Sequence, residues 1–418
     1  MILYLIAFFV IMYYFFISYG NERMCHDNKF LAVSLFVLCS IASFADMLGG
    51  YDRYIYCQFF DITADIVRSG GYAMSYANPL VNQYPSEWIY DMWNVLIAHF
   101  TQNRYMFIVI TTFVIYIVLY KNFKEYFDNY PMAMLAFLGL WYFFTFTYLR
   151  QVMAACTAMI AYRYVLQRKK WKFLLCAFIA YKFHNSAIIF MPFYFLPVKK
   201  WPAKKVRNTM IFLFLIGVSG APMLLYGLYG SASDDTGRTA AYGVDSGART
   251  AYAIEAALFL YYILKRYDRI KEDDTKTLVF LNSALCFCGI LLAFIRSENA
   301  GRQSWYFMIG IIYILCYLSK SRTGILDSYS RQLVVILFLL YIRIINSWGY
   351  QLSPYKTFFT DSYREGDYVA EICEYDWIYE RDKFYRPMIS IYLENWSLWP
   401  KLNDNEKEDG SNSKEKNK

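Results

Sequence analysis

Two pairs of polar residues interrupt or open long apolar runs. His184 and Asn185 lie in the middle of FIAYKFHNSAIIFMPFYF, residues 178–195, and Arg150 and Gln151 open an earlier run. An ionisable side chain in such a segment normally faces a polar interior or a wet cavity, because hydrocarbon solvates it poorly. A guanidinium binds phosphate oxygens through its planar fork, whereas an imidazole donates a hydrogen bond or accepts a proton. These residues predict a buried site for an anion. The structural alternatives are a snorkelling Arg150 and a hydrogen-bonded core His184.

The composition indicates a membrane protein. The chain has 418 residues, of which 58% are hydrophobic, 21% aromatic and only 18% charged. A soluble protein of this length would expose too much apolar surface, so we predict an all-α polytopic membrane protein with about 10–12 transmembrane helices. The net charge of +8 lies in short loops, which favours membrane topology over a nucleic-acid partner. The histidines and cysteines lack metal-ligand spacing and no nucleotide motif is present, so we expect neither metal nor cofactor.

Apolar segments of membrane-spanning length recur along the chain. The predicted spans are residues 2–19, 30–48, 105–120, 132–148, 150–166, 209–229, 251–265, 277–296, 303–319 and 331–349. Residues 1–350 are predicted to form the membrane domain, with segment 49–104 and loop 230–250 at its outer face. A further apolar piece, Trp88–Phe100, lies within segment 49–104. Residues 351–418 are predicted to form an extracytoplasmic tail that is disordered from about 403.

Clusters of Lys and Arg set the predicted orientation. The basic turn QRKKWK, residues 167–172, is placed in the cytoplasm, which puts the N-terminus outside. Residues 197–207 also carry five basic side chains, yet 171–198 is shorter than the roughly 40 residues that two crossings need. A single crossing would leave thirteen basic residues in outer loops and four in inner loops. We therefore predict a re-entrant hairpin over 171–198 with its apex near His184–Ser186, where polar side chains satisfy freed backbone groups.

This hairpin would bring two ionisable residues to one depth. Arg150 lies 13 residues above Arg163, and His184 lies 13 residues above Trp171. Each distance corresponds to about 20 Å of helix, so both side chains should lie in the outer half of the membrane.

Further charged residues are predicted at the outer face. Arg296 and Arg302 lie at the outer ends of consecutive helices, and Arg238 and Arg249 flank the outer loop. The positive-inside rule disfavours such positions, so a bound phosphate would explain them, with pairing to outer acids as the alternative. Asp52, just past the second span, is a candidate base or sugar-positioning group, or else a helix N-cap or solvated loop acid.

Residues 148–196 resemble the signature region of the EpsG family of bacterial polysaccharide-assembly membrane proteins, relatives of Wzy-type polymerases. The resembling positions are Arg150–Gln151, the basic turn Arg168–Lys170, and Phe183 to Ser186. Three further stretches resemble the family more weakly. GGYDRYIYCQFF contributes Asp52 and Tyr56, and GRQSWYF contributes Arg302, Tyr306 and Phe307. The third stretch is the Pro-Tyr element of SPYKTFF.

The resemblance implies a polymerase/ligase architecture like that of the GT-C glycosyltransferases. It implies polymerisation of oligosaccharide repeat units, carried on polyprenyl diphosphate, at the outer face of the bacterial cytoplasmic membrane. The product would be exopolysaccharide, capsule or O-antigen, made without metal or nucleotide. Besides the lipid-linked oligosaccharide and the bilayer, flippase and chain-length regulator proteins are candidate partners.

The site residues follow from the same reasoning. The expected catalytic residues are His184, as hydrogen-bond donor or general base, Arg150, on the diphosphate, and Asp52, as the alternative base. The expected substrate-binding residues are Arg150, Gln151, Arg296, Arg302, Tyr56 and Asn185. Three other functions remain open: a flippase of lipid-linked sugars, a ligase that transfers finished glycan, and a structural subunit without an active site.

Overall fold

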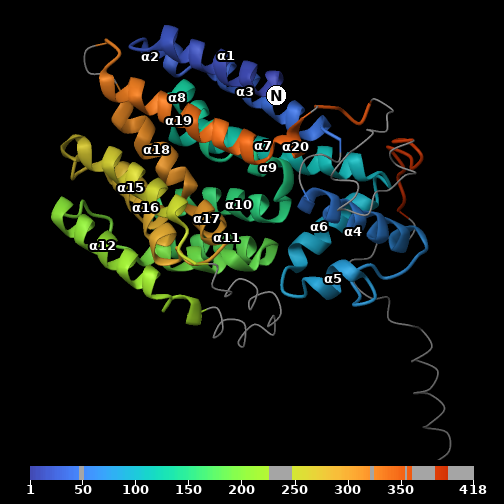
Figure 1. The fold of residues 1–418 in the computed structure, drawn as a ribbon. Helices are drawn as coiled ribbons and strands as arrows, with labels where there is room; N and C mark the ends of the chain where they lie inside the picture. Colours follow the sequence, from blue (N-terminus) through green and yellow to red (C-terminus); the bar gives the residue numbers. More distant parts are fainter. Residues whose placement is uncertain (47–50, 226–246, 321–323, 354, 360–381, 394–418) are drawn as a thin grey trace, which may run out of the picture.

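The computed structural model describes residues 1–46, 51–225, 247–320, 324–353, 355–359 and 382–393 (Figure 1). Within these ranges the chain is helical and forms no strand, and Ala45 and Thr357 make an isolated antiparallel bridge. The predicted all-α class is confirmed.

Most helices follow the predicted apolar segments closely. Two predicted spans differ: the helix Ala203–Ser219 begins and ends earlier than the span 209–229, and the span 132–148 is divided between Tyr130–Leu140 and Phe144–Thr147. The N-terminal half contains α1 (Ile2–Ser18), α2 (Glu22–Cys25), α3 (Asn28–Phe44), α4 (Tyr51–Arg68), α5 (Pro79–Gln83), α6 (Trp88–Ala98), α7 (Arg104–Tyr126), α8 (Tyr130–Leu140), α9 (Phe144–Thr147), α10 (Leu149–Leu166), α11 (Lys170–Phe183) and the 3-10 helix η1 (Asn185–Phe195). The C-terminal half contains α12 (Ala203–Ser219), α15 (Thr250–Lys265), η2 (Tyr267–Arg269), α16 (Thr275–Ala293), α17 (Ala300–Ser304), η3 (Trp305–Phe307), α18 (Met308–Ser319), α19 (Ser328–Ser347) and α20 (Gly349–Leu352).

Polar residues at helix starts explain several of these boundaries. Asn103, Asn129, Asp274 and Asp327 precede α7, α8, α16 and α19, and the side chain of each accepts a backbone N–H of the first turn. Such a cap satisfies a backbone donor that the helix itself leaves unpaired.

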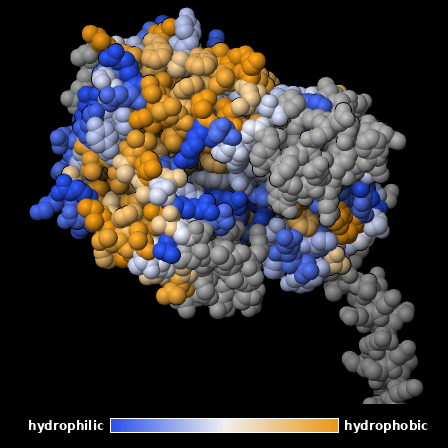
Figure 2. All heavy atoms as spheres, in the orientation of Figure 1, coloured by the Kyte–Doolittle hydropathy of each residue, from blue (hydrophilic) through white to orange (hydrophobic). Residues whose placement is uncertain are grey.

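The exterior of the bundle is apolar. Large hydrophobic side chains are exposed on α1, α3, α12 and α19, for example Phe9, Phe36, Phe212 and Leu339. Figure 2 shows apolar residues over much of the helical body, with hydrophilic residues in a hollow near the centre of this face. Within the described residues, four helical segments are long and apolar enough to cross a membrane: Glu22–Phe44, α7, α16 and α19. The molecule is therefore a polytopic helical membrane protein, whereas the number of crossings stays a prediction.

The core is built around α8, all of whose residues are buried. α8 packs against α1, α3, α18 and α19, and α10 and α16 complete the interior. Glycines allow the closest helix contacts, as is common in membrane bundles. A Cβ at Gly217 would overlap the Leu292 carbonyl oxygen, and one at Gly310 would overlap the Ser283 side chain.

The predicted hairpin over 171–198 is present. α11 ends at Phe183, His184 takes an extended conformation, and η1 returns along α11. Phe173 near the start of α11 meets Tyr194 near the end of η1, with ring centroids 5.3 Å apart. The two basic clusters therefore lie at one end of the hairpin and His184 at the other. The re-entry of this hairpin into the bilayer stays a prediction.

Within the predicted segment 49–104, the described residues 51–98 contain α4, α5 and α6, which form a cluster beside the main bundle (Figure 1). The predicted apolar piece at Trp88–Phe100 corresponds to α6. An ion pair between Arg104 and Asp61 ties the cluster to α7, and backbone bonds from Ser390 and Tyr392 attach residues 382–393 to it. Most of the predicted loop 230–250, and the predicted disorder from about 403, lie outside the described residues.

Candidate active site

A small cavity lies where α4, α10, the hairpin apex and α17 meet. Its volume is about 120 Å³. It is lined by Asp52, Ile55, Tyr56, Tyr84, Tyr148, Arg150, Gln151, His184 and Arg302. Six of the eight predicted site residues therefore come together here from four separate parts of the chain.

Arg150 is held in the first turn of α10 by a carboxylate and by aromatic rings. Its guanidinium forms an ion pair with Glu87, and its Nε lies 3.5 Å from the Tyr56 hydroxyl. The guanidinium carbon also lies 3.5 Å from the centre of the Tyr84 ring. Only 4% of Arg150 is exposed, so this cation is fixed in place at the wall of the cavity.

Glu87 contacts the Arg150 guanidinium and was not predicted from the sequence. It directly precedes α6 and is 1% exposed. One carboxylate oxygen pairs with Arg150, and the other accepts the backbone N–H of Asn185 at 3.0 Å. Asn185 thus lies beside the cavity and joins the site through its backbone. The signal in the sequence was an acid within the otherwise mostly apolar and aromatic stretch YPSEWIYDMW.

Asp91 lies one helical turn beyond Glu87 and is also buried. Within the described residues, neither oxygen of its carboxyl group has a hydrogen-bond partner. Burial, together with the nearby charge of Glu87, raises the pKa of Asp91 to about 8. When Asp91 is protonated it carries no charge, so the negative charge of Glu87 is the one that balances the positive charge of Arg150.

His184 has a defined proton arrangement. Its Nδ1 accepts the backbone N–H of Ser186 at 3.2 Å and lies 2.8 Å from the Ser186 hydroxyl. The same hydroxyl lies 2.7 Å from the Tyr306 hydroxyl. A backbone amide can only donate, so Nδ1 is the unprotonated nitrogen and the neutral ring carries its proton on Nε2. This tautomer makes His184 a hydrogen-bond donor.

Gln151 and Arg302 close the side of the cavity towards α17. The side-chain amide of Gln151 donates to the Arg302 carbonyl at 2.9 Å. The Arg302 guanidinium lies 4.1 Å from the centre of the Tyr148 ring. Arg302 and Tyr148 also line a neighbouring cavity of about 600 Å³, which includes Arg249. The two cavities thus share one wall.

Arg296 and Arg249 do not line the small cavity. Arg296 lines neither cavity, and its guanidinium donates to the Val218 carbonyl near the end of α12 at 3.1 Å. Arg249 pairs with Glu298 at 2.8 Å, which agrees with the alternative of pairing to outer acids. Arg238 lies outside the described residues.

The arrangement of the acidic, histidine and cysteine side chains indicates whether a metal ion could bind. Within the described residues, no group of three or more His, Cys, Asp or Glu side chains is arranged to hold a metal ion. Of the charged side chains that line the Arg150 cavity, the guanidinium groups of Arg150 and Arg302 are suited to an anion, whereas Asp52 is a carboxylate.

The fold and this buried polar site define a polytopic membrane protein. The chain belongs to the EpsG family, whose model matches residues 69–357, more than half of the sequence. The predicted resemblance is confirmed, and with it a membrane role in polysaccharide biosynthesis. Asp52 and Tyr56 precede the matched range. No curated protein and no solved structure matches the chain, so the expected GT-C-like architecture stays a prediction.

Proposed function

We propose that the protein polymerises oligosaccharide repeat units carried on polyprenyl diphosphate, at the outer face of the bacterial cytoplasmic membrane. The observation that carries this proposal is the cavity that combines Arg150, Arg302, His184 and Asp52. Two cations, an N–H donor and a carboxylate suit a reaction in which a diphosphate leaves and a hydroxyl loses its proton.

The sizes of the two cavities support an assignment of the diphosphate and sugar parts of the substrate. The Arg150 cavity, at about 120 Å³, is much smaller than its neighbour, and we therefore assign the diphosphate to it and the oligosaccharide to the larger space. The neighbouring cavity of about 600 Å³ has room for sugar units. Because Arg302 lines both, the bond that breaks lies near their shared wall.

The reaction is a substitution at the anomeric carbon of the donor sugar. A hydroxyl oxygen of the acceptor sugar forms the new glycosidic bond, and the bond from the anomeric carbon to the diphosphate oxygen breaks. Arg150 and Arg302 stabilise the charge that develops on the diphosphate. Asp52 accepts the proton of the acceptor hydroxyl, because Nδ1 of His184 is already engaged by Ser186. His184 donates through Nε2 to a substrate oxygen.

The test is genetic and chemical. The gene is deleted in its host and complemented with wild type, Arg150→Ala, His184→Ala and the control Arg163→Ala. Arg163 lies on the same helix, far from the cavity, and pairs with Glu125 in a half-exposed position. Surface glycan is run on a gel beside lipid-linked oligosaccharide extracted from membranes, after each variant is shown to be present at wild-type level.

The expected result is loss of long chains in the Arg150 and His184 variants only, with single repeat units still reaching the outer face. Single units trapped on the cytoplasmic side would indicate a flippase. Full-length polymer left on its lipid would indicate a ligase. Unchanged chain length in Arg150→Ala would refute the assigned site.

A further inference from the structure

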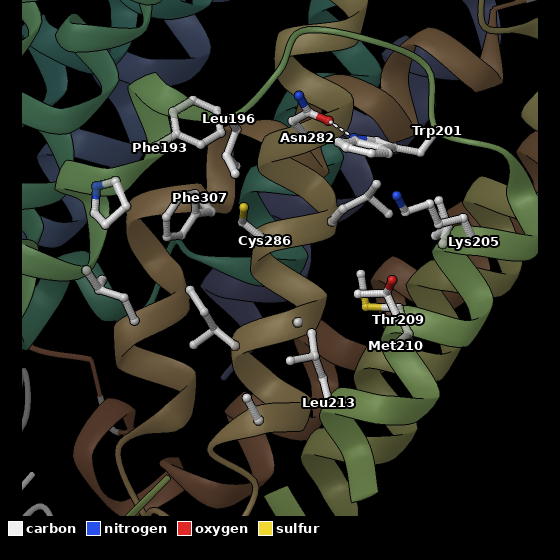
Figure 3. A pocket seen from close by; sticks show the side chains of 17 residues that line it. Phe193, Leu196, Trp201, Lys205, Thr209, Met210, Leu213, Asn282, Cys286 and Phe307 are labelled. Atoms are coloured by element: carbon white, nitrogen blue, oxygen red, sulfur yellow. Dashed lines mark hydrogen bonds between the residues drawn. The ribbon is translucent and has the colours of Figure 1, made fainter. Parts of the chain in front are cut away.

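An apolar groove separate from the candidate active site runs along one side of the bundle (Figure 3). Its volume is about 480 Å³, and η1, α12 and α16 form its walls. The side chains that define its apolar part include Ile189, Phe193, Met210, Leu213, Leu285 and Ile290. Among the described residues, none lines both this groove and the Arg150 cavity.

The packing of α12 against α16 explains the groove. Near the end of α12, Gly217 brings the backbones of both helices into direct contact at Leu292. The groove lies along the first part of α12, beside Met210 (Figure 3). On α16 it extends from Asn282 to Ala293, the last residue of that helix. Most of the remaining α12 side chains are exposed. An apolar groove that faces hydrocarbon is filled by hydrocarbon chains, since water gains no hydrogen bonds there.

One end of the groove is polar and cationic. Trp201 lies at this end, and its indole N–H donates to the Asn282 side chain at 3.2 Å (Figure 3). Asn282 in turn donates to the Pro197 carbonyl at 2.9 Å, so the indole ring is fixed. The Nζ atoms of Lys199 and Lys205 lie 4.3 Å and 4.6 Å from the ring centre. Two ammonium groups are thus held around one aromatic ring.

These lysines are available for an anion. Within the described residues, no carboxylate forms an ion pair with Lys199, Lys204 or Lys205. Lys204 and Lys205 also line a shallow surface hollow next to the groove, together with Asn208 and Thr209. Basic residues beside a membrane helix attract anionic headgroups, and basic pockets between helices bind phospholipid phosphates.

We propose that this groove binds an anionic glycerophospholipid. One acyl chain lies along the apolar wall between η1 and α12, and the phosphate lies between Lys199 and Lys205 beside Trp201. The polyprenyl substrate is a poorer fit, because its diphosphate belongs at Arg150 and His184, at the opposite end of the α11–η1 hairpin from Trp201. This last step rests on the proposed function, whereas the groove and its cationic end do not.

The test measures lipid binding to the full-length protein. Purified protein in mild detergent is stripped of bound lipid and titrated separately with phosphatidylglycerol, phosphatidylcholine or polyprenyl phosphate, and bound lipid is counted by native mass spectrometry. We expect a saturable site for phosphatidylglycerol. Binding should weaken about tenfold or more in the double variant Lys199→Ala/Lys205→Ala, because two charges near the phosphate are lost.

Two further variants make the outcome decisive. Thr209→Trp places a large ring at the groove wall and should reduce binding with all lysines intact. Lys169→Ala/Lys172→Ala removes the same number of charges from the basic turn at the same end of the bundle, and should bind as wild type. Equal loss in this control, equal binding of phosphatidylcholine, or saturable binding only of polyprenyl phosphate would overturn the proposal. Glycan polymerisation is measured in a separate experiment. A negative result for lipid binding can therefore be told apart from a negative result for the proposed polymerase activity.

Discussion

The buried pair between Arg150 and Glu87 allows a structural role to be separated from a functional one. The two side chains are 5% and 1% exposed, so each loses most of its hydration on folding. Removing one partner from such a pair costs about 3–5 kcal/mol, because the other charge stays buried without compensation. Glu87→Gln leaves Arg150 only its neutral partners, Tyr56 and the surrounding rings. Arg150→Met leaves Glu87 only the Asn185 amide.

The double variant Glu87→Gln/Arg150→Met removes both charges together. Its free energy of unfolding should lie well above the value expected from adding the two single losses, with a coupling of about 2–3 kcal/mol. Thermal unfolding in detergent measures this coupling. The control is the Arg163–Glu125 pair on the same helix, whose side chains are 47% and 32% exposed and should couple by no more than about 1 kcal/mol.

The same double variant tests the active site. If Arg150 binds the diphosphate, the double variant regains stability but still makes no long glycan. Recovery of full chain length together with stability would show that the pair only holds the fold, and would refute the catalytic assignment. A coupling no larger than that of the control pair would refute the electrostatic reasoning itself.

Other predictions follow from single side chains. Asp52→Asn should abolish polymerisation in membranes containing wild-type amounts of protein, and near-normal chains would exclude Asp52 as the base. His184→Asn should retain more activity than His184→Ala, because an amide both caps η1 and donates an N–H, and equal loss in both variants would favour a base. The raised pKa of Asp91 means that the folded state holds a proton that the unfolded state releases above about pH 4, so stability should fall as pH rises towards 8. Asp91→Asn should flatten this fall in melting temperature between pH 5 and 8, and an unchanged slope would contradict the burial argument. Gly217→Leu should lower the melting temperature markedly, since its side chain would displace the Leu292 backbone, and an unchanged melting temperature would contradict the packing described for α12.

Much of the fold could be predicted because the signals are local. Membrane-length apolar runs and basic turns determine where helices begin and end, and α10 and α11 share the basic turn between them. Counting 13 residues upward on each side therefore predicted that Arg150 and His184 lie at one depth, and both line one cavity. Their chemical roles stay predictions.

The remaining site features depend on tertiary packing that no local pattern encodes. Glu87 lies 63 residues before Arg150, and only the docking of α6 against α11 brings its carboxylate to the guanidinium. Arg296 was expected at the diphosphate, yet a carbonyl near the end of α12 takes its guanidinium, because helix ends leave acceptors unpaired. The tautomer of His184 likewise depends on the backbone N–H of Ser186 pointing at Nδ1. The pattern of apolar residues in the sequence does not predict the direction of that N–H.

The position of Glu87 also constrains how the α4–α6 cluster can move. Its carboxylate joins three segments: the loop before α6, the start of α10 and the apex of the α11–η1 hairpin. The α4–α6 cluster supplies one wall of the cavity, so any outward movement of this cluster would have to break the bonds at Glu87. Through this one carboxylate, the position of the α4–α6 cluster is coupled to the Arg150 guanidinium and to the hairpin apex.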